Sequence, residues 1–281
     1  MVDRSQEIAD SFMRHWSAFS SDSSATRAQC ELARRLIYRS YPIPVPLTEF
    51  LATATTPPPP KPPPHARRLE EYSWTPVNPE LSEWLVQNIS PVDGKYKVTE
   101  SAQVAVSTVD WYGNWYLLRV ADPHWPNPKL RVYYLLNSSH QLFRLNGTSS
   151  PIHEANELAP IHLTSENVLS YLVFFTFFVR GEEGPFHCIE FLDDPLIAEI
   201  MSADEENPDL LSARAAVEAT VRPLTLEEID DQGRYLCDGV VFYSNAIFAA
   251  NFAVQPDGMV EMLDDEPIAA DLPYKLDAPI T

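Results

Sequence analysis

The chain has 281 residues with an apolar fraction of 45%, which is typical of a globular protein with a real core rather than a disordered chain. Its formal net charge is −20, and residues 182–281 hold 4 basic against 23 acidic side chains, a local net charge of −19. That charge disfavours direct binding of nucleic acid and favours a basic protein partner, with plain solubility as the alternative explanation.

Three features indicate a cytoplasmic protein. The N-terminus lacks the continuous apolar core of a signal peptide. The longest apolar run, residues 169–179, is too short to cross a bilayer, so we expect no membrane span. Cys30, Cys188 and Cys237 are odd in number and widely spaced, which predicts reduced thiols and neither a disulfide framework nor a zinc site.

The N-terminal part is predicted to be helical and then extended. Residues 1–41 are expected to form an N-terminal helical segment, because Ile8, Phe12 and Trp16 recur at helical spacing. Residues 42–72 include a run of prolines that fixes the backbone in the polyproline II conformation. We interpret this segment as a stiff linker, while a ligand for an aromatic groove is the alternative.

Residues 73–160 are predicted to form a first α+β unit. A short helix is expected within 78–90, with Leu81, Trp84 and Leu85 directed inward. Four runs rich in β-branched and aromatic residues follow, separated by turn formers, and they predict an antiparallel meander. These runs are 101–111, 114–121, 130–137 and 140–147.

Residues 161–281 are predicted to form a second, acidic α+β unit. Segment 212–268 parallels segment 101–152 in its order of strands and turns, which supports the hypothesis of an internal duplication. Each unit would be a helix followed by a four-stranded sheet, an architecture that resembles cystatin-like and NTF2-like folds. The fold class is therefore α+β, with two such units around a buried central helix and additional N-terminal helices. The acidic segment 263–267 is interpreted as a solvated loop.

The central helix is predicted from the stretch "NVLSYLVFFTFFVRGEEGPFHC", residues 167–188. Residues 164–167 carry helix-start signals and Gly181 is a helix-stop signal, while nearly every position between them is apolar. A helix that is apolar on all sides must be buried on all sides. A buried strand is the alternative, although about 14 residues is long for one strand.

The best candidate binding site follows that helix. Arg180, Glu182 and Glu183 are bracketed by glycines, and His187 stands beside Cys188 near the start of a predicted strand. Neighbouring residues on a strand point to opposite faces, so His187 and Cys188 cannot act as a base and a nucleophile together. The alternative is a loop that only turns the chain from helix to strand.

Two other groups are candidates for binding. Trp111 and Trp115 lie where strand alternation exposes every second side chain, so an aromatic platform is one interpretation and core packing is the other. His153 and His162 lie close to Glu154 and Glu157, but their spacing matches no metal motif. We predict no metal and no cofactor.

These observations favour a non-catalytic adaptor or inhibitor protein whose acidic surface binds a basic partner, with homo-oligomerisation left open. The alternative is a small-molecule binding protein or enzyme with a cavity between helix and sheet. His153, His162 or His187 would then be the acid or base.

Overall fold

The computed structural model describes residues 72–77, 79–89, 98–113, 115–127, 130–137, 141–159, 161–203 and 208–273. The predicted N-terminal helices and the proline-rich linker lie outside these residues. The described chain is a mixed α+β protein with antiparallel sheets, as predicted. Its described residues divide into two compact units, which we call the amino-terminal unit (72–146 and 150–159) and the carboxy-terminal unit (147–149 and 161–273).

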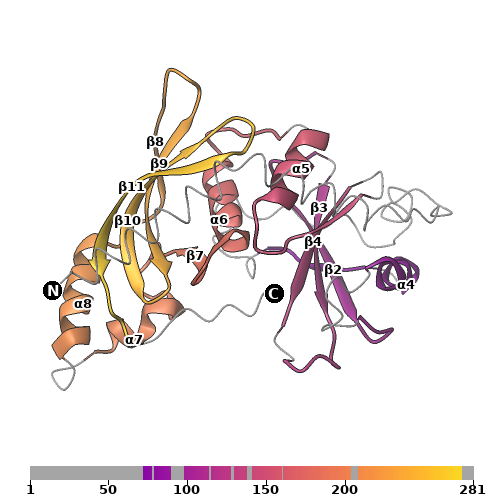
Figure 1. Cartoon of the computed structure of the whole chain (residues 1–281), viewed down its shortest axis with the longest axis horizontal. Helices are drawn as coiled ribbons and strands as arrows, with labels where there is room; N and C mark the ends of the chain where they lie inside the picture. Colours follow the sequence, from indigo (N-terminus) through magenta and orange to yellow (C-terminus); the bar gives the residue numbers. More distant parts are fainter. Residues whose placement is uncertain are drawn as a thin grey trace. The chain divides into compact units, whose positions relative to one another are not determined.

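The amino-terminal unit contains a five-stranded meander in which each strand pairs with the next one in sequence (Figure 1). All the pairings are antiparallel, which confirms the prediction from the four strand-like runs. The strands are β1 (Thr75–Pro76), β2 (Gln103–Thr108), β3 (Trp115–Ala121), β4 (Val132–Asn137) and β5 (Leu142–Arg144).

Two helices accompany this sheet. Helix α4 (Pro79–Asn88) and the residue that follows it contribute Leu85 and Ile89 to a core with Val104, Leu118 and other side chains of one sheet face. The predicted inward positions Leu81 and Trp84 are part of α4, but their side chains are outside the described set. Helix α5 (Ser150–Leu158) follows β5, and its Asn156 accepts a hydrogen bond from the Tyr112 hydroxyl.

The carboxy-terminal unit is built around the long strand β9 (Tyr235–Tyr243). On one side, β9 pairs along its whole length with β10 (Ala246–Val254), which pairs with the edge strand β11 (Val260–Ala269). On its other side, β8 (Thr225–Ile229) pairs with the first half of β9. The second half pairs with β7 (Gly184–Cys188), which continues to β6 (Arg180–Gly181).

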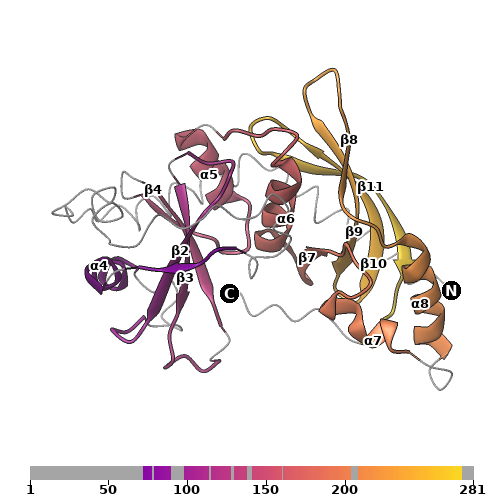
Figure 2. The same cartoon turned by 180° about the vertical axis from the view of Figure 1, so that it is seen from behind.

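Helix α6 (Val168–Phe178) is the buried helix that the sequence predicts over this stretch. Tyr171, Leu172 and Phe178 are among the seven buried residues of its eleven, and its rings pack on each other. The helix contacts β7 and β8 of its own unit (Figure 2), so the phenylalanines have a packing role.

The ends of α6 differ from the prediction. The helix ends before Val179, which already has an extended backbone, and Gly181 belongs to β6 instead of terminating the helix. The reason is that Arg180 and Gly181 pair with Pro185 and Gly184 in a hairpin, which requires extended backbone directly after the helix. At the other end, Asn167 bonds to Thr164 and His162 and makes no side-chain cap.

The opposite sheet face of this unit is partly covered by short helices. The 3-10 turn η2 (Pro195–Ile197), α7 (Ala198–Met201) and α8 (Pro208–Thr220) supply Ile197, Ile200 and Val217 to a core cluster. The strand residues in that cluster are Val240, Phe242, Ile247 and Ala269. The helices thus cover the half of the face that carries these apolar side chains.

The two sheets share a strand order but differ in detail from the predicted correspondence. Strands β2–β5 and β8–β11 are both four-stranded meanders. Yet the start of segment 212–268 lies within helix α8, whereas the start of segment 101–152 leads into strand β2. Among the described residues, no helix is long and apolar enough to cross a membrane.

Candidate functional site

The predicted loop at Arg180, Glu182 and Glu183 is the tight turn of the β6–β7 hairpin. It is anchored by the Tyr243 hydroxyl, which accepts a hydrogen bond from the Glu183 amide at 3.1 Å. The Ser244 hydroxyl donates to the Glu183 carboxylate, and a Cβ at position 181 would overlap the Tyr243 ring. This glycine is therefore required by close packing, and the hairpin has a structural role.

Burial near this turn changes the acidity of two groups. Burial lowers the pKa of the Arg180 guanidinium, whose buried Nε and Nη2 atoms have no hydrogen-bond partner among the described residues. The Arg180 amide donates to the Gly147 carbonyl at 2.9 Å, and Gly147 has a positive φ of 93°. Burial also raises the pKa of Tyr243, and the carboxylates of Glu183 and Glu182 add to that rise against the hydrogen bond from the Glu183 amide.

His187 and Cys188 lie at the end of β7 and not at the start of a strand. His187 packs edge-on against the ring of Phe177 with centroids 5.4 Å apart, while the Cys188 sulfur lies 3.7 Å from the Thr176 hydroxyl. Burial is the main cause that raises the pKa of Cys188, and likewise that of Cys237, to about 12. Both thiols therefore stay protonated at neutral pH and are poor nucleophiles.

Trp111 and Trp115 are core residues, with exposed fractions of 0% and 1%. Their neighbours are aromatic, since Tyr112 packs against both rings and Phe143 lies 5.4 Å from Trp115. The aromatic-platform interpretation does not hold for these two side chains. The reason is that the chain turns between β2 and β3 and directs both rings into the interior of the unit.

The histidines considered as ligands or bases are not assembled into one site. His153 and Glu154 are in α5, whereas His162 is exposed between α5 and α6. Within the described part of the chain, no group of three or more His, Cys, Asp or Glu side chains could hold a metal ion.

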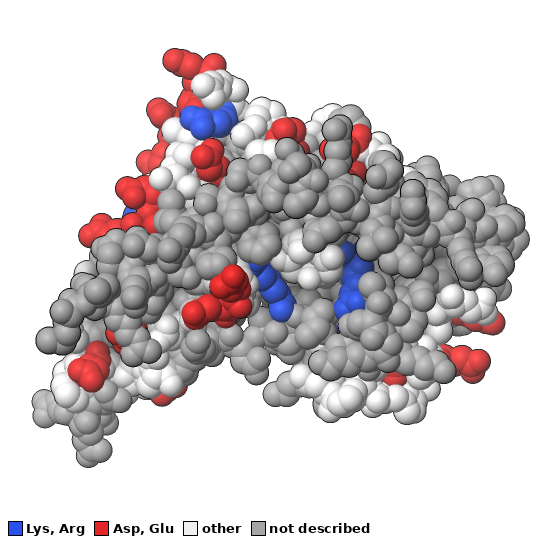
Figure 3. Space-filling model, in the orientation of Figure 1, with Lys and Arg blue, Asp and Glu red and all other residues white. Residues whose placement is uncertain are grey.

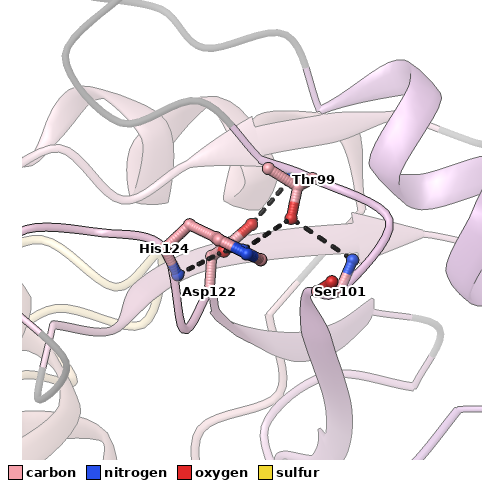
Figure 4. A network of polar contacts seen from close by, with 4 residues as sticks. All are labelled: Thr99, Ser101, Asp122 and His124. Carbon is pink, nitrogen blue, oxygen red and sulfur yellow. Dashed lines mark hydrogen bonds and ion pairs between the residues drawn. The ribbon is translucent and has the colours of Figure 1, made fainter.

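A polar network that the sequence analysis did not identify joins the β3–β4 connection to residue 99 (Figure 4). The buried carboxylate of Asp122 accepts hydrogen bonds from the amides of Thr99 at 2.6 Å and His124 at 2.9 Å. Its Oδ1 atom also lies 3.1 Å from His124 Nδ1. Burial alone would raise the pKa of Asp122, but these hydrogen bonds lower it below its ordinary value.

This network is not a nucleophilic triad. The Thr99 hydroxyl lies 3.3 Å from the same His124 Nδ1 that faces Asp122. A triad needs the carboxylate and the hydroxyl on opposite ring nitrogens, so the hydroxyl is not activated here. The network instead holds two loops together, and its signal in the sequence was only the Asp-Pro-His turn at 122–124.

A group of carboxylate side chains lies on one face of the sheet of the carboxy-terminal unit. Residues opposite each other in neighbouring strands share a sheet face, and alternate residues along a strand do so as well. Val240 and Phe242 of β9 face α7 and α8, so Leu236 and Asp238 of the same strand are on that face too.

The pairing registers then identify the rest of this face. The row through Leu236 contains Glu228, Ala253 and Glu261, and the row through Asp238 contains Thr225, Asn251 and Asp264. The row through Val240 contains Ala249 and Glu266. We call the five carboxylates on these rows the acidic face: Glu228, Asp238, Glu261, Asp264 and Glu266.

Only part of this charge is neutralised. Arg222 binds both oxygens of Asp238 at 2.8 Å, and Arg234 lies 3.9 Å from Glu261 while bonding to Asp230 at 2.7 Å. The exposed side chains of Glu228, Asp264 and Glu266 have no ion-pair partner among the described residues. An excess of negative charge therefore remains at the solvent surface.

The space-filling view shows acidic side chains gathered along the side of this unit where Figure 1 places β8 and β11 (Figure 3). Segment 263–267, interpreted as a loop, belongs to strand β11. Irregular pairing near Leu263 and Ile268 interrupts the alternation of inward and outward side chains that would have marked this segment as a strand. Comparison with known proteins finds no matching family, no similar curated protein and no similar solved structure.

Proposed function

We propose that this protein is a non-catalytic adaptor or inhibitor that binds a basic protein through the acidic face. The observation that carries the proposal is the set of exposed, unneutralised carboxylates of Glu228, Asp264 and Glu266 on one sheet face. Because β-strands hold these side chains in a fixed pattern, they lose little freedom of position when a partner binds. A partner with Lys or Arg side chains in a matching pattern gains both affinity and rate of association.

Several weaker expectations accompany this proposal. The shared meander order of β2–β5 and β8–β11 supports an internal duplication, while the helical start of segment 212–268 weighs against it. The free thiols of Cys188 and Cys237 suit a reducing compartment and support a cytoplasmic location. The acidic charge of β11 opposes pairing of its edge with a second copy, so we expect homo-oligomers to use another surface.

The proposal is tested by affinity capture from a native lysate with three versions of the full chain. The first is the wild type, the second is E228Q/D264N/E266Q, and the third is E100Q/E157Q/E166Q. All residues of the third variant are exposed and lie outside the acidic face, and both variants change the net charge by +3.

We expect the wild type and the control variant to retain a basic protein at 50 mM NaCl and to release it at 300 mM. Exposed ion pairs contribute about 0.2–1 kcal/mol each, so three lost pairs weaken binding about twenty-fold in the middle of that range. Mass spectrometry identifies the protein, and its dissociation constant is then measured with purified components. If E228Q/D264N/E266Q retains the same protein equally well, or if the wild type retains nothing at low salt, the proposal is wrong.

A further inference from the structure

Arg180 is a largely buried cation for which the described residues provide no counterion. It lies directly before the turn of the β6–β7 hairpin, and its Nε and Nη2 atoms are buried with no hydrogen-bond partner in the described part of the chain. No carboxylate of the described residues lies within ion-pair distance of this guanidinium. A guanidinium stays protonated in proteins, and a buried charge without a partner is costly, so we expect an anion to offset this cost.

The two carboxylates of the hairpin itself do not pair with Arg180. The Glu183 carboxylate accepts a hydrogen bond from the Ser244 hydroxyl, while the Glu183 amide donates to the Tyr243 hydroxyl. Glu182 is exposed at the turn. Burial and then both carboxylates raise the pKa of Tyr243, whereas burial lowers the pKa of Arg180 with no opposing contribution from either carboxylate. The negative charge of the hairpin therefore acts on Tyr243 and leaves Arg180 for another anion.

The backbone and the aliphatic stem of Arg180 are held in place. Its amide donates to the Gly147 carbonyl at 2.9 Å, and its Cδ lies 3.2 Å from the position that a Cβ would take at Gly147. The next residue, Gly181, packs under the Tyr243 ring. A side chain that is already fixed in this way loses little conformational freedom when it binds a ligand.

The two nitrogens without a partner form one edge of the guanidinium. The N–H bonds of Nε and Nη2 lie side by side and match the two oxygens of a carboxylate in a bidentate pair. A phosphate carries more negative charge than a carboxylate, so the strongly acidic carboxy-terminal unit favours the carboxylate. We propose that this edge of Arg180 is a carboxylate-binding site. The site is independent of the proposed function, since its charge is opposite to that of the acidic face.

One source of the carboxylate is the segment that follows the described residues. The Leu272 amide donates to the Asn245 carbonyl at 3.0 Å, and the neighbouring Ser244 bonds to the hairpin, so the described chain ends close to it. Two strand spacings, about 10 Å, separate β9 from β6 across β7. Asp277 follows Leu272 by five residues, and five extended residues span about 17 Å, so its carboxylate can reach Arg180.

The other source is a separate molecule that carries a carboxylate, for which acetate is the probe. The test follows the Nε–H signal of Arg180 in proton–nitrogen NMR spectra of the full chain, assigned by correlation with the backbone amide of the same residue. The variant for the first source is Asp277→Asn. Its matched control is Asp209→Asn, an exposed position of α8 that changes the net charge equally.

Each source gives a different result. If Asp277 binds Arg180, the Nε proton exchanges with solvent at least ten-fold more slowly in the wild type than in Asp277→Asn, while Asp209→Asn leaves the rate unchanged. If a separate ligand binds, the signal shifts saturably with sodium acetate and not with sodium chloride at equal concentration, and the signal of the exposed Arg214 shows no such saturation. The inference is overturned if neither Asp277→Asn nor acetate changes the Arg180 signal, or if acetate shifts Arg214 in the same way.

Discussion

Truncation of Phe174 in the middle of helix α6 is the most direct test of how the carboxy-terminal unit is held together. This side chain is 1% exposed, and its ring meets the ring of Phe178 edge-on with centroids 4.9 Å apart. Phe→Ala in a packed core costs about 3–5 kcal/mol, which includes about 0.5–1.5 kcal/mol for an aromatic pair. We expect Phe174→Ala to lower the free energy of unfolding of this unit by about that amount.

The assay must report on one unit at a time. All six tryptophans lie in the first 125 residues, so tryptophan fluorescence does not report directly on the carboxy-terminal unit. Hydrogen exchange with mass spectrometry does, through peptides that cover α6 and β9. A loss of 3–5 kcal/mol raises their exchange rates by about two to nearly four orders of magnitude, provided that exchange occurs through opening of the whole unit.

The matched control is Phe177→Ala, which removes the same atoms from a half-buried position of the same helix. We expect it to cost about 1–2 kcal/mol, because less apolar surface is withdrawn from water there. The reasoning is refuted if Phe174→Ala costs less than 1 kcal/mol or no more than Phe177→Ala. Either result would mean that burial of α6 does not stabilise the unit.

Two further predictions concern ionisable groups. The pKa of Asp122 is lower folded than unfolded, so its carboxylate stabilises the protein above the unfolded value of about 3.9, and this contribution disappears as the pH falls through the folded value. Urea titrations of wild type and Asp122→Asn between pH 3 and 7 should therefore show a stability difference that is constant at the upper end and shrinks below about pH 4; a difference independent of pH contradicts this assignment. With the thiol pKa of Cys188 and Cys237 raised to about 12, we expect a Cys30→Ser chain to resist iodoacetamide at pH 8 and to react at both thiols in urea. Rapid labelling of the folded chain, measured by mass spectrometry, would show that the thiols are accessible and ionised.

The sequence by itself determined the type of most elements. Continuous apolar character over Val168–Phe178 favoured a buried helix over a buried strand because of its length, and turn formers between β-rich runs were sufficient for the β2–β5 meander. The same local signals failed where pairing between strands decides conformation. Gly181 reads as a helix terminator, but its pairing with Gly184 makes it a strand residue.

Only the tertiary structure decided which side chains share a surface. Trp111 and Trp115 read equally well as exposed or buried, and packing against Tyr112 and Phe143 placed them in the core. Composition located the negative charge in the last hundred residues but not on a particular face. Glu228, Asp238 and Asp264 are distant in sequence, and they share one face because antiparallel register, with its irregularities, aligns β8 and β11 across β9 and β10. Register depends on contacts between strands far apart in the chain, which local sequence patterns do not encode.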